Sequence, residues 1–297
     1  MPFLTTPPAR FAALPDYPYE PRFVHDLPSA QGMAMHYIDT GGGQEVFLCL
    51  HGNPAWSYLY RKMIPVFAPH GRVVAPDMLG FGKSDKPTDE AAHTFVWHRE
   101  LLLEFIRRLD LDQITLVVQD WGGILGLTLP MDLAGRVKRL LVMNTTLAAG
   151  DGVTPGFMAW RDYSNAHPDL DVAALFERAE PYIDAAEAAA YAAPFPDASF
   201  KAALRAFPNR VPIGADEPGA AIARRARDWY SQHWHGPTFL AVGARDPVLG
   251  TSAMQALARM IPHAGPVMVL DDAGHFVQER GDRIALAALA HFGIGGR

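Results

Sequence analysis

The chain has 297 residues, of which 49% are hydrophobic and 20% are charged, as is typical of a soluble globular protein. Its 26 basic and 32 acidic residues give a net charge of −6 without long runs of one sign, which argues against nucleic-acid or membrane partners. The single cysteine, Cys49, excludes a disulfide within the chain. The first residues do not show a basic segment followed by an apolar one, as a secretory signal would, and no apolar run is long enough to span a membrane. We therefore expect a cytoplasmic protein.

Strand-like and helix-like segments alternate along the first half of the chain. The strand-like segments are short apolar runs, and the helix-like segments place apolar residues three or four positions apart. Such alternation predicts an α/β protein with a mostly parallel sheet flanked by helices. The expected strands cover residues 32–40 (an edge strand or hairpin), 46–50, 72–76, 114–118 and 137–143, and the expected helices cover 56–66, 95–109 and 124–129.

The pattern changes after residue 147. Residues 148–213 contain no strand-like run, and Ala-rich pieces such as 185–193 predict short helices separated by prolines. We therefore expect residues 1–147 and 217–297 to form a core domain, with residues 148–216 inserted as a helical cap. Core elements are expected to resume with a helix at 220–234, strands at 238–242 and 267–270, and a helix at 282–292.

Asp120 occupies the sharpest predicted turn. A buried strand, residues 114–118, leads into Gln119-Asp120-Trp121, and the small pair Gly122-Gly123 precedes a helix. This order is similar to the nucleophile elbow of α/β-hydrolases, which lifts a reactive side chain off a strand end. The serine signature Gly-x-Ser-x-Gly does not match, because the nucleophile would be Asp. Taken alone, Asp120 is more simply interpreted as a helix N-cap.

Two further polar residues favour the catalytic interpretation. Asp246 and His275 also follow expected strands, and the carboxyl ends of parallel strands form the edge where ligands bind. The order nucleophile, acid, His is that of the α/β-hydrolases. Asn144 is a rival for the acid position, but an amide carries no charge to stabilise an imidazolium, so we favour Asp246.

Seven segments of the chain match motifs of one known family: 51–61 (HGNPAWSYLYR), 75–77 (APD), 80–87 (GFGKSDKP), 118–123 (VQDWGG), 157–160 (FMAW), 191–197 (YAAPFPD) and 272–279 (DAGHFVQE). They extend over nearly the whole chain and include the expected cap. On these segments the chain resembles the haloalkane dehalogenases of the α/β-hydrolase superfamily.

This resemblance implies an α/β-hydrolase fold and hydrolysis of a haloalkane to a primary alcohol, halide and a proton. Asp120 would form an alkyl ester, and His275 with Asp246 would activate the water that cleaves it. Trp121 and Trp160 would bind the halide, although Asn53 matches the halide-binding residue of another branch of the family. Phe157 would line the pocket. The backbone N–H groups of Asn53 and Trp121 would form the oxyanion hole.

The resemblance implies neither cofactor nor metal, and no metal-binding motif is present. The partners would be a small halogenated alkane, water and halide. An epoxide hydrolase is the nearest alternative, since it shares an Asp nucleophile but needs cap tyrosines, for which Tyr163, Tyr182 and Tyr191 are available. A non-catalytic ligand-binding relative is a second alternative, although such proteins commonly lose a triad residue.

Overall fold

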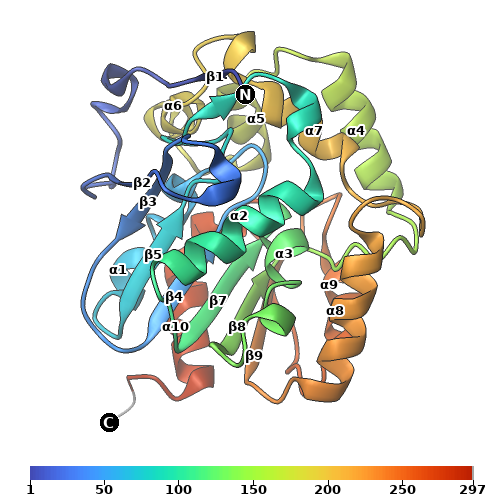
Figure 1. Ribbon diagram of the computed structural model, residues 1–297. Helices are drawn as coiled ribbons and strands as arrows, with labels where there is room; N and C mark the ends of the chain where they lie inside the picture. Colours follow the sequence, from blue (N-terminus) through green and yellow to red (C-terminus); the bar gives the residue numbers. More distant parts are fainter. Residues whose placement is uncertain (296–297) are drawn as a thin grey trace.

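An eight-stranded sheet forms the centre of the protein (Figure 1), described here from a computed structural model that covers residues 1–295. The six strands from β10 to β5 pair in parallel, whereas β3 and β2 pair antiparallel at one side. In spatial order the strands are β10 (Met268–Leu270), β9 (Thr238–Gly243), β8 (Val137–Met143), β7 (Ile114–Gln119), β4 (Val46–Leu50), β5 (Arg72–Pro76), β3 (Met35–Asp39) and β2 (Arg22–Val24).

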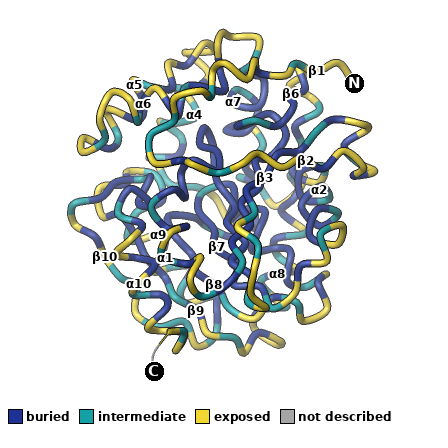
Figure 2. The backbone as a smooth tube through the Cα atoms, turned by 90° about the vertical axis from the view of Figure 1, so that its left-hand side faces the viewer, coloured by how far each residue is buried: buried dark blue, intermediate teal, exposed yellow. Residues whose placement is uncertain are grey.

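Helices cover both faces of this sheet. In Figure 1, α2, α3 and α8 lie in front of the sheet, and α1 and α10, which contact each other, lie behind it. Every residue of β4 and β7 is buried, which explains their unbroken apolar sequences. Figure 2 shows the same buried centre inside a more exposed outer layer. The helices of this layer are α1 (Ile64–Phe67), α2 (Phe95–Arg108), α3 (Trp121–Gly126), α8 (Ala220–His233), α9 (Thr251–Met260) and α10 (Gly281–Phe292).

Four short helices follow β8 and lie beyond the carboxyl ends of the parallel strands (Figure 1). Three of them have an N-cap residue whose side chain accepts a backbone N–H from the first turn of the helix: Thr154, Asp171 and Asp184. An antiparallel bridge between Asp151 and Gly214 joins the two ends of this segment. The helices are α4 (Pro155–Ala166), α5 (Val172–Ala179), α6 (Ala185–Ala192) and α7 (Ala202–Ala206).

Most of the expected elements are confirmed. The prediction for residues 56–66 was wrong in form, because a 3-10 turn at Ser57–Tyr60 and the short α1 replace one helix. The β3 strand pairs on both sides, so β2 forms the edge. We did not expect β2 or α9, nor the two-stranded ribbon of β1 (Phe3–Leu4) and β6 (Lys86–Pro87). The division into a core and a 148–216 cap stays a prediction.

No helix within residues 1–295 is both long enough and apolar enough to cross a membrane.

We predict that Gly122→Ala destabilises the protein by about 3 kcal/mol or more, because a Cβ atom there would lie 2.0 Å from the carbonyl oxygen of Leu50. Strand β4 and helix α3 would have to separate. Urea unfolding measures the loss. Gly265→Ala is the matched control, since its nearest neighbour would lie at an ordinary 3.6 Å, and its free energy of unfolding should stay within about 1 kcal/mol. Equal stabilities of the two variants would contradict this account.

Candidate active site

Asp120 lies at the turn between β7 and α3 in a backbone conformation that non-glycine residues rarely adopt (φ 48°, ψ −124°). Its backbone N–H donates to the carbonyl oxygen of Asn144 (3.0 Å), and its own carbonyl oxygen accepts from the Thr145 hydroxyl (2.6 Å). The Asp120 side chain makes no capping hydrogen bond to α3. The simpler N-cap interpretation is therefore wrong, and the carboxylate is free for another role.

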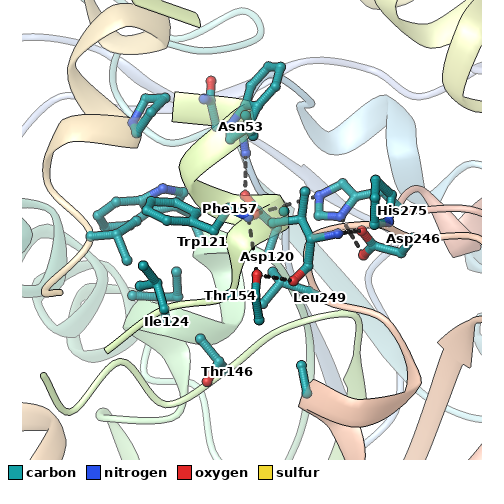
Figure 3. Close-up of a pocket in the computed structure, with 18 of the residues that line it drawn as sticks. Asn53, Asp120, Trp121, Ile124, Thr146, Thr154, Phe157, Asp246, Leu249 and His275 are labelled. Atoms are coloured by element: carbon teal, nitrogen blue, oxygen red, sulfur yellow. Dashed lines mark hydrogen bonds and ion pairs between the residues drawn. The ribbon is translucent and has the colours of Figure 1, made fainter. Parts of the chain in front are cut away.

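Figure 3 shows Asp120, Asp246 and His275 together on one side of a pocket. They follow β7, β9 and β10, three strands on the same side of the sheet. The His275 Nδ1 atom lies 2.8 Å from Asp246 Oδ2, and its Nε2 atom lies 3.6 Å from Asp120 Oδ2. The imidazole thus lies between two carboxylates, in the arrangement of a nucleophile, a base and an acid.

Asn144 supports Asp246 and does not replace it. The Asn144 amide nitrogen donates to Asp246 Oδ2 (2.8 Å), and the amide oxygen accepts from the Gly243 N–H (3.0 Å). The backbone N–H of Val248 donates to the other oxygen of Asp246 (2.7 Å). Burial disfavours the charge of Asp246, but His275 and these donors lower its pKa. Asp246 is therefore ionised beside the imidazole.

Gln119 is a contact of His275 that the sequence did not suggest. Its amide nitrogen lies 3.1 Å from the carbonyl oxygen of His275 and 3.0 Å from His275 Nε2. Because the carbonyl oxygen can only accept, the nitrogen of the amide faces it, and the second N–H points at the ring. The ring can accept that hydrogen bond only when Nε2 is unprotonated. Gln119 therefore favours the neutral form of His275.

Asp120 and Asp246, in contrast to Gln119, favour the protonated form of His275. Burial disfavours the cationic form of His275, but Asp246 and Asp120 more than offset it and raise the pKa of His275 to about 10. Conversion of Asp120 into a neutral ester would remove one of these charges. The pKa of His275 would then fall, and the imidazole would become available as a base.

The loop after β4 supplies a hydrogen-bond donor to the nucleophile. The backbone N–H of Asn53 donates to Asp120 Oδ1 (2.8 Å). A Cβ atom at Gly52 would lie 2.3 Å from the same oxygen, so the glycine permits this close approach. The N–H of Trp121, the other expected oxyanion donor, makes no hydrogen bond to the Asp120 carboxylate within residues 1–295.

A cavity of about 1100 Å³ lies above Asp120. It is large enough for a small organic ligand. Trp121 is almost fully buried, whereas Trp160 is only partly buried in α4. The residues that the resemblance to haloalkane dehalogenases implied for catalysis or binding all line this one cavity: Asn53, Asp120, Trp121, Phe157, Trp160, Asp246 and His275.

The cap tyrosines are not arranged as a pair over this cavity. Tyr163 lines it, but Tyr182 is 57% exposed beneath the Arg280 guanidinium. Tyr191 is fully buried and its hydroxyl donates to Glu279. This arrangement does not favour the epoxide hydrolase alternative, which needs hydroxyl donors near the nucleophile.

Comparison with known proteins agrees with this geometry. A family described as the alpha/beta hydrolase fold matches residues 45–282. A protein of Mycobacterium marinum named haloalkane dehalogenase is 40% identical over 94% of this chain and 95% of its own length. A haloalkane dehalogenase of Psychrobacter cryohalolentis is 37% identical over 96% of both chains. The solved structure of haloalkane dehalogenase DpaA from Paraglaciecola agarilytica superposes with a TM-score of 0.96, at 44% identity over 98% of both chains.

The fold and the family match over residues 45–282 place the chain among the α/β-hydrolases. Within that superfamily it belongs to the haloalkane dehalogenases, hydrolases that act on carbon–halide bonds.

We predict that Asp120→Asn lowers the pKa of His275, because the substitution removes one of the two negative charges that stabilise the imidazolium. NMR titration of the His275 ring measures the change, with the signal assigned from the spectrum of a His275→Gln variant. Asp112→Asn, an exposed position before β7 at the opposite end of the strand, is the control and should leave this pKa unchanged. An unchanged pKa in Asp120→Asn would contradict the electrostatic coupling.

Proposed function

We propose that Asp120 attacks the carbon that bears the halogen. Its Oδ2 atom forms the new C–O bond while the C–halogen bond breaks and the halide leaves with the electron pair. One observation carries this assignment: the carboxylate faces the cavity from the elbow, with Oδ1 held by the Asn53 N–H and Oδ2 on the side of His275. The two oxygens therefore have separate environments, one for the oxyanion hole and one for attack.

The halide needs donors as its negative charge develops. We assign the indole N–H groups of Trp121 and Trp160, since an indole can donate but not accept and both side chains line the cavity. The side chain of Asn53 is the competing donor. Its oxygen is buried without a partner within residues 1–295, and its amide is also on the cavity wall. Phe157 would contact the alkyl group.

The second half of the reaction regenerates Asp120. Water adds to the carboxyl carbon of the ester as His275 Nε2 takes its proton, and Asp246 stabilises the imidazolium. The N–H groups of Asn53 and Trp121 would bind the oxyanion. Collapse of this intermediate expels the alkoxide, which takes a proton and leaves as a primary alcohol. Each turnover thus consumes a haloalkane and water, and releases halide, alcohol and a proton.

The same proposal covers the parts of the protein around the site. Residues 148–216 act as a cap that closes the cavity, since α4 contributes Phe157 and Trp160 to its wall. The reaction as written requires no cofactor. We place the protein in the cytoplasm, where its single buried cysteine would remain a thiol.

We predict that His275→Gln separates the two half-reactions, because alkylation needs only Asp120 and halide donors, whereas hydrolysis needs a base. Given a bromoalkane, the variant should release about one halide per active site and then stall. Intact mass should increase by the alkyl group, and peptide mapping should place that group on Asp120. Asp120→Ala is the control and should show neither burst nor mass gain. An unmodified mass in a folded His275→Gln variant, with an active parent, would refute the assigned mechanism.

We predict that bromide quenches tryptophan fluorescence and that Trp160→Phe weakens this binding by about tenfold or more, because it removes a hydrogen bond to a charged ligand. Fluorescence titration gives the dissociation constant. Trp229→Phe, which changes a tryptophan outside the catalytic cavity, is the control. If Asn53→Ala weakens bromide binding and Trp160→Phe does not, Asn53 is the second halide donor.

A further inference from the structure

Glu180 is a buried carboxylate of the proposed cap, residues 148–216, and it contacts the loop that carries His275. It follows α5 directly and is 1% exposed. Its Oε1 atom accepts the backbone N–H of Gly274 (3.1 Å) and that of Phe276 (3.2 Å). These two residues are the neighbours of His275 in the chain. One cap side chain therefore holds the backbone on both sides of the imidazole.

Packing adds to this contact. A Cβ atom at Gly274 would lie 2.8 Å from the carbonyl oxygen of Ala179 and 2.8 Å from Glu180 Oε1, so the loop lies directly against the end of α5. The ring of Phe276 stacks on Phe176 of α5, with centroids 4.0 Å apart. Residues 179 and 181 also line the catalytic cavity. The segment that holds the base is thus part of the substrate cavity wall.

Glu180 is a poor choice of residue for stability alone. It makes no ion pair within residues 1–295, and its Oε2 atom is buried without a hydrogen-bond partner there. Burial and the nearby Glu279 raise the pKa of Glu180 to about 7, although the two N–H donors and Arg280 act in the opposite direction. A buried charge with such neighbours costs free energy when it is ionised. This cost indicates a role beyond holding the fold together.

We propose that Glu180 is a positioning residue for His275, which couples the cap to hydrolysis of the alkyl ester by holding the backbone on both sides of the base. This inference rests on the assignment of His275 as the base. Alkylation needs only Asp120 and the halide donors, so it does not depend on where His275 lies. Hydrolysis requires Nε2 to be aimed at a water molecule, and small misplacements of a catalytic group cost up to about a hundredfold in rate.

Single-turnover kinetics with a bromoalkane test the proposal, with halide release and decay of the alkyl-enzyme mass followed separately. Glu180→Ala should release halide at the parent rate but hydrolyse the ester about tenfold more slowly. Glu180→Gln keeps a carbonyl oxygen that can accept both N–H groups, and should hydrolyse within about threefold of the parent. The control is Glu177→Ala, an exposed position on α5, the helix that Glu180 follows. This variant should change neither halide release nor ester hydrolysis.

Glu180→Asp keeps the charge but shortens the side chain, and should slow hydrolysis as Glu180→Ala does. It also keeps the test decisive if the alanine variant does not fold. Ester hydrolysis at the parent rate in folded Glu180→Ala or Glu180→Asp would overturn the proposal, and so would equal slowing of both half-reactions. Failure of the base assignment is distinguishable, because it would appear as the absence of a trapped ester in His275→Gln.

Thermal unfolding separates positioning from a structural role. A raised pKa means that the folded protein favours protonated Glu180. The penalty for ionisation is therefore absent at pH values below the unfolded pKa and complete above about pH 7. Relative to the parent, Glu180→Gln should gain stability as the pH rises from about 5 to 8. A relative loss over this range would show that the ionised carboxylate stabilises the fold, and would overturn the proposal.

Discussion

The site depends on the strained turn at Asp120, which two hydrogen bonds from the chain after β8 hold in place. Positive φ is unfavourable for a residue with a Cβ, and it persists here because the N–H of Asp120 is bound by Asn144 and its carbonyl oxygen by Thr145. This turn directs the carboxylate away from the helix it precedes and into the cavity. Gly122 allows α3 to pass against the end of β4 immediately afterwards. The strain is thus maintained by tertiary contacts, and its result is a carboxylate that faces the cavity.

Asn144 links this turn to the rest of the chemistry. Its backbone carbonyl oxygen accepts the N–H of Asp120. Its side-chain amide nitrogen donates to Asp246, and its side-chain oxygen accepts the N–H of Gly243 at the end of β9. The parallel order of β7, β8, β9 and β10 makes this possible, because four consecutive strand ends meet at one edge of the sheet. Asn144, which follows the second of these ends, can therefore contact Asp120 after the first through its backbone and Asp246 after the third through its side chain. The sheet thus brings Asp120, Asp246 and His275 to one edge, and hydrogen bonds of the loops after the strands set the distances between them.

The sequence predicted the sheet, and it indicated Asp120, Asp246 and His275 as candidate site residues, because both features have local signatures. Apolar runs such as 46–50 and 114–118 are strands buried on both faces, and polar residues that follow such runs in the order Asp120, Asp246, His275 converge at one edge. The contacts of Gln119 and Glu180 with the His275 loop have no such signature, since they join residues 156 and about 95 positions apart in the chain. The helix α9 was not expected, although its two buried residues, Met254 and Leu257, have helical spacing. Asn144 was noticed as a rival acid, but only the fold reveals it as a support for Asp246.

The charges around His275 favour one protonation state before the proposed esterification of Asp120 and another after it. In the free enzyme two carboxylates flank His275 and favour the imidazolium, while Gln119 presents an N–H that favours the neutral ring. Esterification of Asp120 would remove one negative charge and leave the contribution of Gln119 unchanged, so the balance would move toward the neutral base once the intermediate exists. Asp246 would keep its charge, and its hydrogen bond to Nδ1 would keep Nε2 on the side of Asp120. Esterification would then activate His275 as a base. The carboxylate that becomes the ester, Asp120, is one of the two whose negative charge had kept the imidazole protonated.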